Sequence, residues 1–203
     1  MQFATCAMIA FEGPDGTGKT TLLNQVAAKL RSLSVSVEVV DYRTSKTGRA
    51  AYELARNHEG NEMTRRYLMA AAAEEARETI YEHWTRSLIL LDRLHPISDW
   101  CYSYDALEFH ERDRWRQLSD SQGWFRPGTE LTFLLRFRHR APTHALERRP
   151  VDECYRDLPM LRRLAGGEEK NQIVVLTDEV AVPEDALLIA AIDAIKNRGL
   201  IWE

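Results

Sequence analysis

Apolar residues along the 203-residue chain form short runs, and longer segments of mixed polarity separate them. The runs are rich in leucine, isoleucine and valine and predict buried strands at residues 8–11, 35–40, 87–91, 131–135 and 173–176. The longer segments predict helices at residues 19–33, 49–57, 62–84, 96–120 and 186–196. Strands that alternate with helices are typical of βαβ units, which build a parallel sheet covered on both faces. We therefore expect an α/β fold with a five-stranded parallel sheet, in a single domain spanning residues 1–203.

Composition and charge narrow the class of protein. The net charge of −4 argues against broad electrostatic binding to duplex DNA, although it is compatible with a local basic groove. No apolar run approaches the ~20 residues of a membrane span. The opening segment lacks the basic start and the cleavage site of a signal peptide, so we expect a cytoplasmic protein without membrane contact. The cysteines have no metal-ligand spacing and suit a reducing compartment; they are Cys6, Cys101 and Cys154.

The first predicted strand ends in a glycine-rich segment that carries the strongest motif of the chain. Its residues match G-x-x-x-x-G-K-[ST], the P-loop pattern, at every fixed position; they are Gly13, Pro14, Asp15, Gly16, Thr17, Gly18, Lys19 and Thr20, followed by Thr21. Glycines let backbone N–H groups wrap the phosphates of ATP, and the helix that follows adds its positive dipole end. We expect Lys19 to reach the β- and γ-phosphates and the Thr20 hydroxyl to reach Mg²⁺.

A second polar pair directly follows the predicted strand at residues 87–91. Asp92 stands at the carboxyl end of this strand, where a carboxylate can hold Mg²⁺ or its waters beside a phosphate loop. The Arg93 guanidinium can clamp an acceptor phosphate through two hydrogen bonds. A surface ion pair at a strand end is the alternative interpretation, but the P-loop upstream favours a catalytic site.

These segments resemble the thymidylate kinase family, within the nucleoside monophosphate kinases. Residues 11–21 are similar to the family's F-E-G-x-[DE]-G-x-G-K-[ST]-T loop. Residues 92–102 are similar to its D-R-[YH]-x-x-S-x-x-A-[YF] segment, with one residue inserted and Leu94 in place of the aromatic residue. The resemblance implies a three-layer P-loop NTPase fold, ATP and Mg²⁺, and phosphoryl transfer to a nucleoside monophosphate such as dTMP. It also implies a homodimer, for which the Ala-rich face of helix 62–84 is a candidate interface.

The resemblance further implies an acceptor site. Asp15 is expected to face the sugar or phosphate of the acceptor, and Arg43 stands where the family places an acceptor-phosphate arginine. Gly48 matches a glycine beyond that arginine. Ser98 and Tyr102 match the acceptor side of the segment after Asp92, although Tyr102 and the neighbouring aromatic residues are equally compatible with a core role.

The base-binding helix departs from the family. Counting back from Asp92, the position of the family's base-contacting arginine is Ala72, and Leu68 replaces the aromatic residue one turn earlier. Other arginines of this region do not have that spacing; they are Arg65, Arg66 and Arg77. The departure leaves phosphoryl transfer in place and leaves the identity of the base open.

Arginines crowd the stretch from residue 136 to residue 163, where this family inserts a lid. We expect the lid at about residues 137–165, with Tyr155 matching a lid tyrosine. Arginines that close over the γ-phosphate stabilise the charge that spreads over its oxygens, and closure excludes water. A solvated basic face is the alternative. Arg149 is the first candidate for the catalytic contact, beside Lys19, Asp15, Asp92 and Arg93.

Two other functions remain open from the sequence alone. The acceptor can be a hydroxyl group, in a deoxynucleoside or in 5-hydroxymethyluracil within DNA, with Asp15 or Asp92 as general base. The missing base-contacting arginine and the basic stretch motivate this alternative, the only one in which nucleic acid is a partner. The second alternative is a P-loop module that binds a nucleotide and hydrolyses it slowly, against which Arg43 and Arg93 speak.

Overall fold

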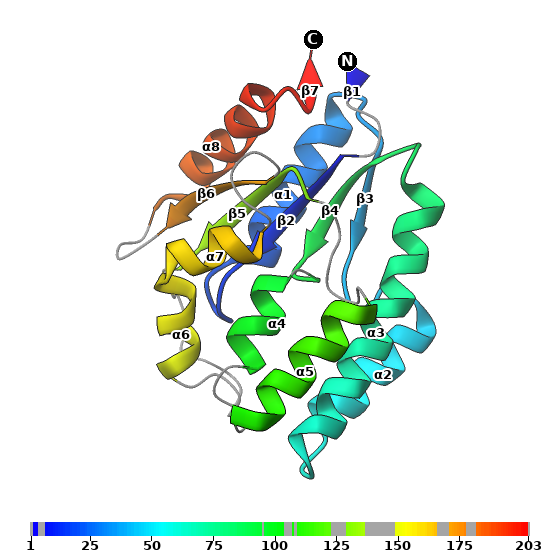
Figure 1. Ribbon diagram of the computed structural model, residues 1–203. Helices are drawn as coiled ribbons and strands as arrows, with labels where there is room; N and C mark the ends of the chain where they lie inside the picture. The colour runs from blue at the N-terminus through cyan, green and yellow to red at the C-terminus, as the bar shows by residue number, and fades with distance from the viewer. Residues whose placement is uncertain are drawn as a thin grey trace.

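The computed structural model describes residues 2–3, 7–94, 96–103, 107, 109–122, 129–136, 149–165, 171–177 and 182–202. At its centre lies a five-stranded sheet in the order β3-β4-β2-β5-β6, in which every neighbouring pair is parallel (Figure 1). The strands are β2 (Met8–Glu12), β3 (Val37–Val40), β4 (Leu88–Asp92), β5 (Leu131–Leu135) and β6 (Gln172–Thr177). The five predicted strands and their parallel arrangement are confirmed.

Helices cover both faces of this sheet and make three layers (Figure 1). One face carries α1 (Lys19–Ser32) and α8 (Glu184–Asn197), whose apolar side chains share a core with Ile9 and Phe11. The other face uses the alternate residues of the same strand, Met8 and Ala10, in a core with α3 (Glu62–His83). Because successive side chains of a strand point to opposite faces, a strand covered on both faces must be apolar throughout. The remaining helices lie on this second face: α2 (Lys46–Arg56), α3 (Glu62–His83), α4 (Pro96–Ser103), α5 (Phe109–Gln122), α6 (Arg149–Arg156) and α7 (Leu158–Leu164).

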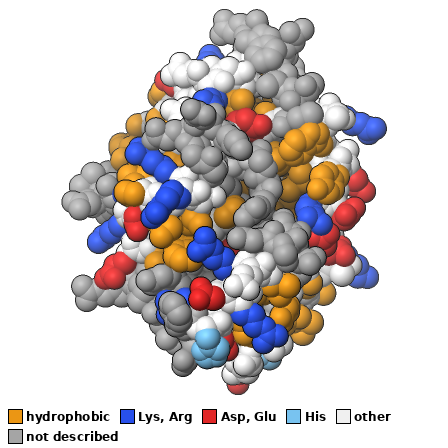
Figure 2. Space-filling model, viewed as in Figure 1, with side chains coloured by type: hydrophobic (Ala, Val, Ile, Leu, Met, Phe, Trp, Pro, Cys, Tyr) orange, Lys and Arg blue, Asp and Glu red, His pale blue; other side chains and the backbone are white. Residues whose placement is uncertain are grey.

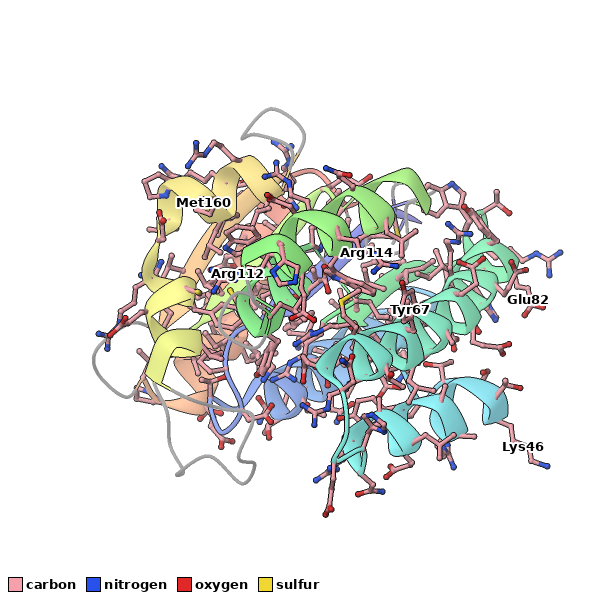
Figure 3. All side chains as sticks on the ribbon, turned by 60° about the horizontal axis from the view of Figure 1, so that its bottom comes forward. Lys46, Tyr67, Glu82, Arg112, Arg114 and Met160 are labelled. Atoms are coloured by element: carbon pink, nitrogen blue, oxygen red, sulfur yellow. The ribbon has the colours of Figure 1, made fainter. Side chains whose placement is uncertain are left out.

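One predicted helix is wrong in its extent. The segment 96–120 forms two helices, α4 and α5, instead of one. No proline or glycine marks the break. Tertiary contacts favour it. Leu107, which lies between the two helices in the sequence, is buried in the core shared with α3 and the sheet, and the Trp115 indole of α5 donates to the Asp99 carboxylate of α4 at 3.1 Å. Tyr67 of α3 meets the Trp115 ring edge-on and lies on the side of α3 that faces α5 (Figure 3).

The Ala-rich face of α3 packs inside the chain. Ala70, Ala72, Ala73 and Ala76 are all buried in the core between α3 and the sheet. Small side chains let the helix approach the strands closely, which uses this face completely. The expectation that the same face forms a dimer interface is therefore wrong, because a face buried within one chain has no surface left for a partner.

The strand order brings the functional segments to one edge. The chain runs from β2 outward to β3, returns to β4, and then crosses to the other side of β2 for β5 and β6. The carboxyl ends of β2, β4 and β5 therefore flank the point where the winding reverses, which is where open α/β sheets bind ligands. At the opposite end, β1 (Gln2–Phe3) pairs antiparallel with β7 (Ile201–Trp202), side by side in Figure 1. No helix in the described part of the chain is long and apolar enough to cross a membrane.

Candidate active site

The P-loop connects β2 to α1 through three glycines with positive φ. Gly13, Gly16 and Gly18 have φ values of 141°, 80° and 86°. Residues that carry a Cβ rarely adopt such positive φ values. At Gly13 the space is also closed, because a Cβ would lie 1.9 Å from the carbonyl oxygen of Leu135 at the end of β5. The loop is held by its own side chains as well, since the buried Thr17 hydroxyl donates to the carbonyl of Pro14 at 3.0 Å.

Lys19 opens α1 and is buried beneath the loop. Its ammonium donates to the Pro14 carbonyl at 2.9 Å and lies 3.8 Å from the Asp15 carboxylate. Burial, together with the positive charge of Arg93, lowers the pKa of Lys19 to about 8, although the neighbouring carboxylates act in the opposite direction. A buried ammonium whose charge is disfavoured by burial is prepared to receive the negative charge of phosphate groups.

The predicted metal ligands come together. The Thr20 hydroxyl, one residue beyond Lys19, donates to the Asp92 carboxylate at 2.6 Å, although the two residues are 72 positions apart in the sequence. A hydroxyl and a carboxylate are oxygen ligands of the kind Mg²⁺ prefers, and a nucleotide magnesium site commonly uses only one or two protein groups. No cluster of three or more His, Cys, Asp or Glu side chains exists among the described residues. The pair therefore fits Mg²⁺ bound with a nucleotide better than a metal held by the protein alone.

Arg93 lies at the centre of the site. Its guanidinium donates to the Asp15 carboxylate, to the Tyr102 hydroxyl at 2.7 Å and to the Gly13 carbonyl at 3.5 Å. Burial alone would lower the pKa of Arg93, but Tyr102 and Asp15 raise it well above its usual value. Arg93 and Leu94 both have left-handed backbone conformations, with φ values of 68° and 59°. Two consecutive non-glycine residues in this region store strain, which persists only where surrounding contacts enforce it.

Glu12 is a site residue to which the sequence argument assigned no role. It is the last residue of β2, it has no exposed surface, and it precedes Gly13 directly. The Ser98 hydroxyl donates to it, lying 2.8 and 2.6 Å from its two oxygens, and the Tyr155 hydroxyl donates to Oε2 at 3.0 Å. Burial raises the pKa of Glu12 to about 7, while Ser98 and the positive charge of Arg93 act in the opposite direction. A glutamate that ends an apolar strand was the available signal.

The predicted acceptor residues fall into two groups. Tyr102 contacts Arg93 through its hydroxyl and its ring, whose centroid lies 4.8 Å from the guanidinium carbon. Arg43 follows β3 and is paired with Asp41 at 2.6 Å, and both Asp41 and Asp92 act to raise its pKa against burial. Ser98, in contrast, is buried and its hydroxyl is engaged by Glu12.

Gly48 has a structural reason of its own. It lies in the first turn of α2, where a Cβ would come within 2.9 Å of the Tyr42 carbonyl oxygen. Its N–H donates to the capping hydroxyl of Ser45 at 2.8 Å, so the close approach also fixes the start of the helix that follows Arg43.

Helix α3, for which the family resemblance implied contacts with the base, buries different residues from those that the family spacing implied. Ala72 has no exposed surface and packs in the core, and Leu68 is half-buried. The buried arginine of this helix is Arg66, whose guanidinium is held by Glu62 at 2.9 Å and donates to the carbonyl of Tyr102. Arg66 therefore reaches the segment that carries Tyr102, although its position in the sequence does not match the family pattern.

The predicted lid is described only in its second half. Residues 137–148 lie outside the described part of the chain, and α6 begins at Arg149, whose side chain is also outside it. In the described half, Tyr155 and Leu161 are buried against α4 and the sheet. Basic side chains gather on the outer surface over α6 and α7 (Figure 2), and the exposed residues there include Arg156, Arg162 and Arg163. A lid over residues 137–165 within a single domain, with Arg149 as its catalytic arginine, stays a prediction.

Comparison with known proteins complements this geometry. Residues 11–164 match a family model described as thymidylate kinase. Among solved structures, the thymidylate kinase of Ehrlichia chaffeensis is similar with a TM-score of 0.67 at 15% identity, over 95% of this chain and 100% of that chain. The thymidylate kinase of Candida albicans is similar with a TM-score of 0.63 at 17% identity, over 98% of this chain and 96% of that chain. No curated protein matches the sequence. At such identities the solved structures establish the fold, and the family model carries the assignment.

Proposed function

Because the chain belongs to the thymidylate kinase family, whose members transfer the γ-phosphoryl group of ATP to a nucleoside monophosphate such as dTMP, we propose which of its residues carry out each part of that reaction. The proposal rests on one observation. The Asp15 carboxylate contacts both the Lys19 ammonium and the Arg93 guanidinium, so a single loop side chain joins the two cations that attract phosphate.

ATP binds on residues 13–21. The backbone N–H groups of the loop and the start of α1 receive its phosphates, and Lys19 neutralises charge on the β- and γ-phosphates. The Lys19 ammonium does not need to be recruited from solvent, because it already lies beneath the loop with a pKa lowered by burial. Thr20 and Asp92 hold Mg²⁺, which when bound neutralises charge on the phosphate oxygens.

The acceptor binds on the other side of Asp15. Arg93 clamps its phosphate, Tyr102 orients the Arg93 guanidinium, and Asp15 and Arg43 limit where sugar and phosphate can lie. An acceptor phosphate is already anionic at neutral pH, so no general base is needed and the residues act by positioning and charge neutralisation. In this proposal Leu68 completes the acceptor side, Ser98 supports it from within through its hydrogen bond to Glu12, and Arg149 enters from the lid.

We also propose a cytoplasmic homodimer. The family resemblance supports it, and two large side chains on the outer surface of α2 and α3 are strongly exposed, Leu54 at 63% and Tyr81 at 61%. Light scattering after size-exclusion chromatography tests the oligomeric state. A Leu54→Glu variant that remains dimeric places the interface elsewhere, and a monomeric wild type refutes the dimer.

The test of the acceptor is ADP release from Mg-ATP with a panel of acceptors. The panel contains deoxynucleoside monophosphates, free deoxynucleosides, and DNA with or without 5-hydroxymethyluracil. We expect turnover with dTMP or another monophosphate. Turnover only with a hydroxyl acceptor would reassign Asp15 and Arg43, and hydrolysis that no acceptor accelerates would indicate a nucleotide-binding module.

Lys19→Ala tests the donor site. We expect kcat/KM to fall by roughly 10²–10³-fold or more, the loss typical of removing one preorganised transition-state contact. The fold should survive, because burying this ammonium is unfavourable and its loss removes that cost. Lys29→Ala, an exposed lysine in the last turn of the same helix, is the matched control and should keep full activity. Normal turnover in Lys19→Ala would sink the assignment of the loop.

A further inference from the structure

The carboxylate of Glu12 joins three segments that the sequence separates widely. It belongs to β2 and precedes the P-loop, Ser98 belongs to α4, and Tyr155 lies 143 positions away in α6. All three side chains are buried, and the Ser98 and Tyr155 hydroxyls are themselves 3.5 Å apart. A buried carboxyl group with hydroxyl donors from two helices is costly to form and rigid once its hydrogen bonds are satisfied.

The contact with Ser98 sets the start of α4 relative to the P-loop. The connection from β4 to this helix begins with Arg93 and Leu94, both in strained left-handed backbone conformations. Such a turn keeps its conformation only if both of its ends are held. The Arg93 N–H donates to the Phe11 carbonyl at 3.2 Å on one side, and Ser98 is anchored to Glu12 on the other. Phe11 and Glu12 are neighbours, so one end of β2 holds both sides of the turn.

The same helix returns to Arg93 through Tyr102. The Tyr102 hydroxyl accepts from the Arg93 guanidinium at 2.7 Å, and its ring meets Tyr155 edge-on with centroids 6.4 Å apart. Contacts therefore run in a closed circuit from Glu12 to Ser98, along α4 to Tyr102, to Arg93, and back to Gly13. The Tyr155 side chain contacts this circuit at Glu12, at Ser98 and at Tyr102.

We infer that Glu12 is a positioning residue for the acceptor site: through Ser98 and Tyr155 it fixes α4 and α6 against the P-loop and thereby aims the Arg93 guanidinium. The inference rests on the proposed role of Arg93 as the acceptor clamp. The donor side depends less on Glu12, because the loop is also held by the Thr17 and Lys19 contacts to the Pro14 carbonyl. Loss of Glu12 should accordingly affect the acceptor more than ATP.

Glu12→Gln and Glu12→Ala separate positioning from mere stability. The amide of Gln keeps groups that hydrogen-bond to both hydroxyls, so its kinetic constants should stay within about threefold of wild type. In Glu12→Ala the hydrogen bonds to Ser98 and Tyr155 are lost, so Arg93 is no longer held in place from this side. We expect the KM for the acceptor to rise by about tenfold or more while the KM for ATP changes little, because a small misplacement of the Arg93 guanidinium weakens acceptor binding. Equal changes in both KM values, or a Gln variant as impaired as the Ala variant, would overturn the inference.

Tyr155→Phe and Asn171→Ala complete the experiment. Tyr155→Phe removes one hydroxyl, keeps the ring, and should raise the acceptor KM in the same direction by a smaller factor, which keeps the inference testable if Glu12→Ala does not fold. Asn171→Ala is the control, because Asn171 is also a buried polar residue, held by Thr129 and Thr132 at the opposite end of the sheet. The same selective rise in acceptor KM in Asn171→Ala, or no change in Tyr155→Phe, would count against Glu12. Failure of the proposed function itself is distinguishable, because the wild type would then show no turnover that depends on an acceptor.

Discussion

Asp15 and Glu12 are carboxyl groups only three residues apart, and their surroundings give them different chemistry. Asp15 is half-exposed and lies between two cations, Lys19 and Arg93, so its charge is compensated. Glu12 has no exposed surface and is held mainly by hydroxyl groups, which satisfy its oxygens without supplying a full positive charge. Burial therefore dominates at Glu12 and raises its pKa to about 7.

This raised pKa predicts how stability depends on pH. Between the usual value of 4.5 and about 7, the folded protein keeps a proton on Glu12 that the unfolded chain has released. The folded state then binds more protons, so the free energy of unfolding falls as pH rises through this window. At about 1.4 kcal/mol per pH unit, the free energy of unfolding of the wild type should fall by about 3 kcal/mol across this window. Glu12→Gln has no proton to lose at this position and should not show this fall. Urea denaturation of both proteins at pH 5 and pH 8 measures the difference. Equal losses in the two proteins would contradict the assignment.

Ala72 and its neighbour Ala71 test whether the position of the family's base-contacting arginine belongs to the core or to the acceptor site. Ala72 is buried in the core and Ala71 is exposed on the same helix. Restoring the family's arginine as Ala72→Arg should destabilise the fold by about 3 kcal/mol or more, because it buries an unpaired charge in a packed core. Ala71→Arg should change stability by less than about 0.5 kcal/mol. Thermal unfolding compares them. A stable Ala72→Arg variant with a lower KM for dTMP would restore the position to the acceptor site.

At the scale of single elements, backbone conformation explains both tolerance and strain. Ser34 follows the end of α1 with φ 63° and an exposed side chain, the position where helices usually place glycine. Gly199 occupies the equivalent position after α8 with φ 70°, and a Cβ there would meet no atom within 4 Å. The two helix ends therefore share one left-handed conformation, which is unfavourable for Ser34 and favourable for Gly199.

Substitutions at these two positions should change the free energy of unfolding in opposite directions. Ser34→Gly relieves a left-handed conformation and should raise the free energy of unfolding by about 0.5–1 kcal/mol. Gly199→Ala imposes the same conformation on a residue with a Cβ and should lower it by about 1 kcal/mol, with no steric clash to add to the loss. Urea denaturation measures both, and kcat should be unchanged, since Ser34 follows the end of α1 remote from the P-loop and Gly199 precedes β7 at the opposite end of the sheet. Shifts of the same sign would show that the backbone argument fails.

The turn at Arg93 and Leu94 differs from these helix ends. Its strain is stored beside the site, where Leu94 is buried and Arg93 is held by three acceptors. Strained backbone at such a position persists because the surroundings enforce it, and here it places the guanidinium over the P-loop side of the sheet edge.

For the whole molecule, the distribution of charge predicts the class of acceptor. The net charge is −4, and in the described part of the chain the Lys19, Arg43 and Arg93 cations at the carboxyl edge of the sheet are paired with Asp15 and Asp41. A protein that makes 6–10 phosphate contacts with DNA loses about 10³–10⁵ in affinity between 50 and 200 mM salt. We expect the KM for a monophosphate acceptor to change by only about a few fold over this range. Steady-state kinetics at the two salt concentrations measures it, with fluorescence anisotropy of a labelled oligonucleotide as control. Tight, steeply salt-dependent oligonucleotide binding would favour a DNA acceptor instead.

The sequence by itself determined the P-loop and the elements on either side of it. A P-loop is local in the chain, and so its glycines, Lys19 and Thr20 can be read directly, as can the strand that precedes them and the helix that follows. Asp92 and Arg93 were also recognisable, because a polar pair at the end of an apolar strand must lie at the edge of the sheet. The alternation of strands and helices was sufficient to predict the parallel sheet.

Only the tertiary structure decided the remainder, because it depends on contacts between residues far apart in the chain. The break between α4 and α5 has no local signal and follows from packing around Leu107. The burial of Ala72 depends on how α3 meets the sheet, which counting from Asp92 could not reveal. Glu12 gained its raised pKa and its partners only when Ser98 and Tyr155 closed over it from two helices. Burial and long-range hydrogen bonding are properties of the folded chain, and they assemble the contacts around Arg93 on which the proposed acceptor site depends.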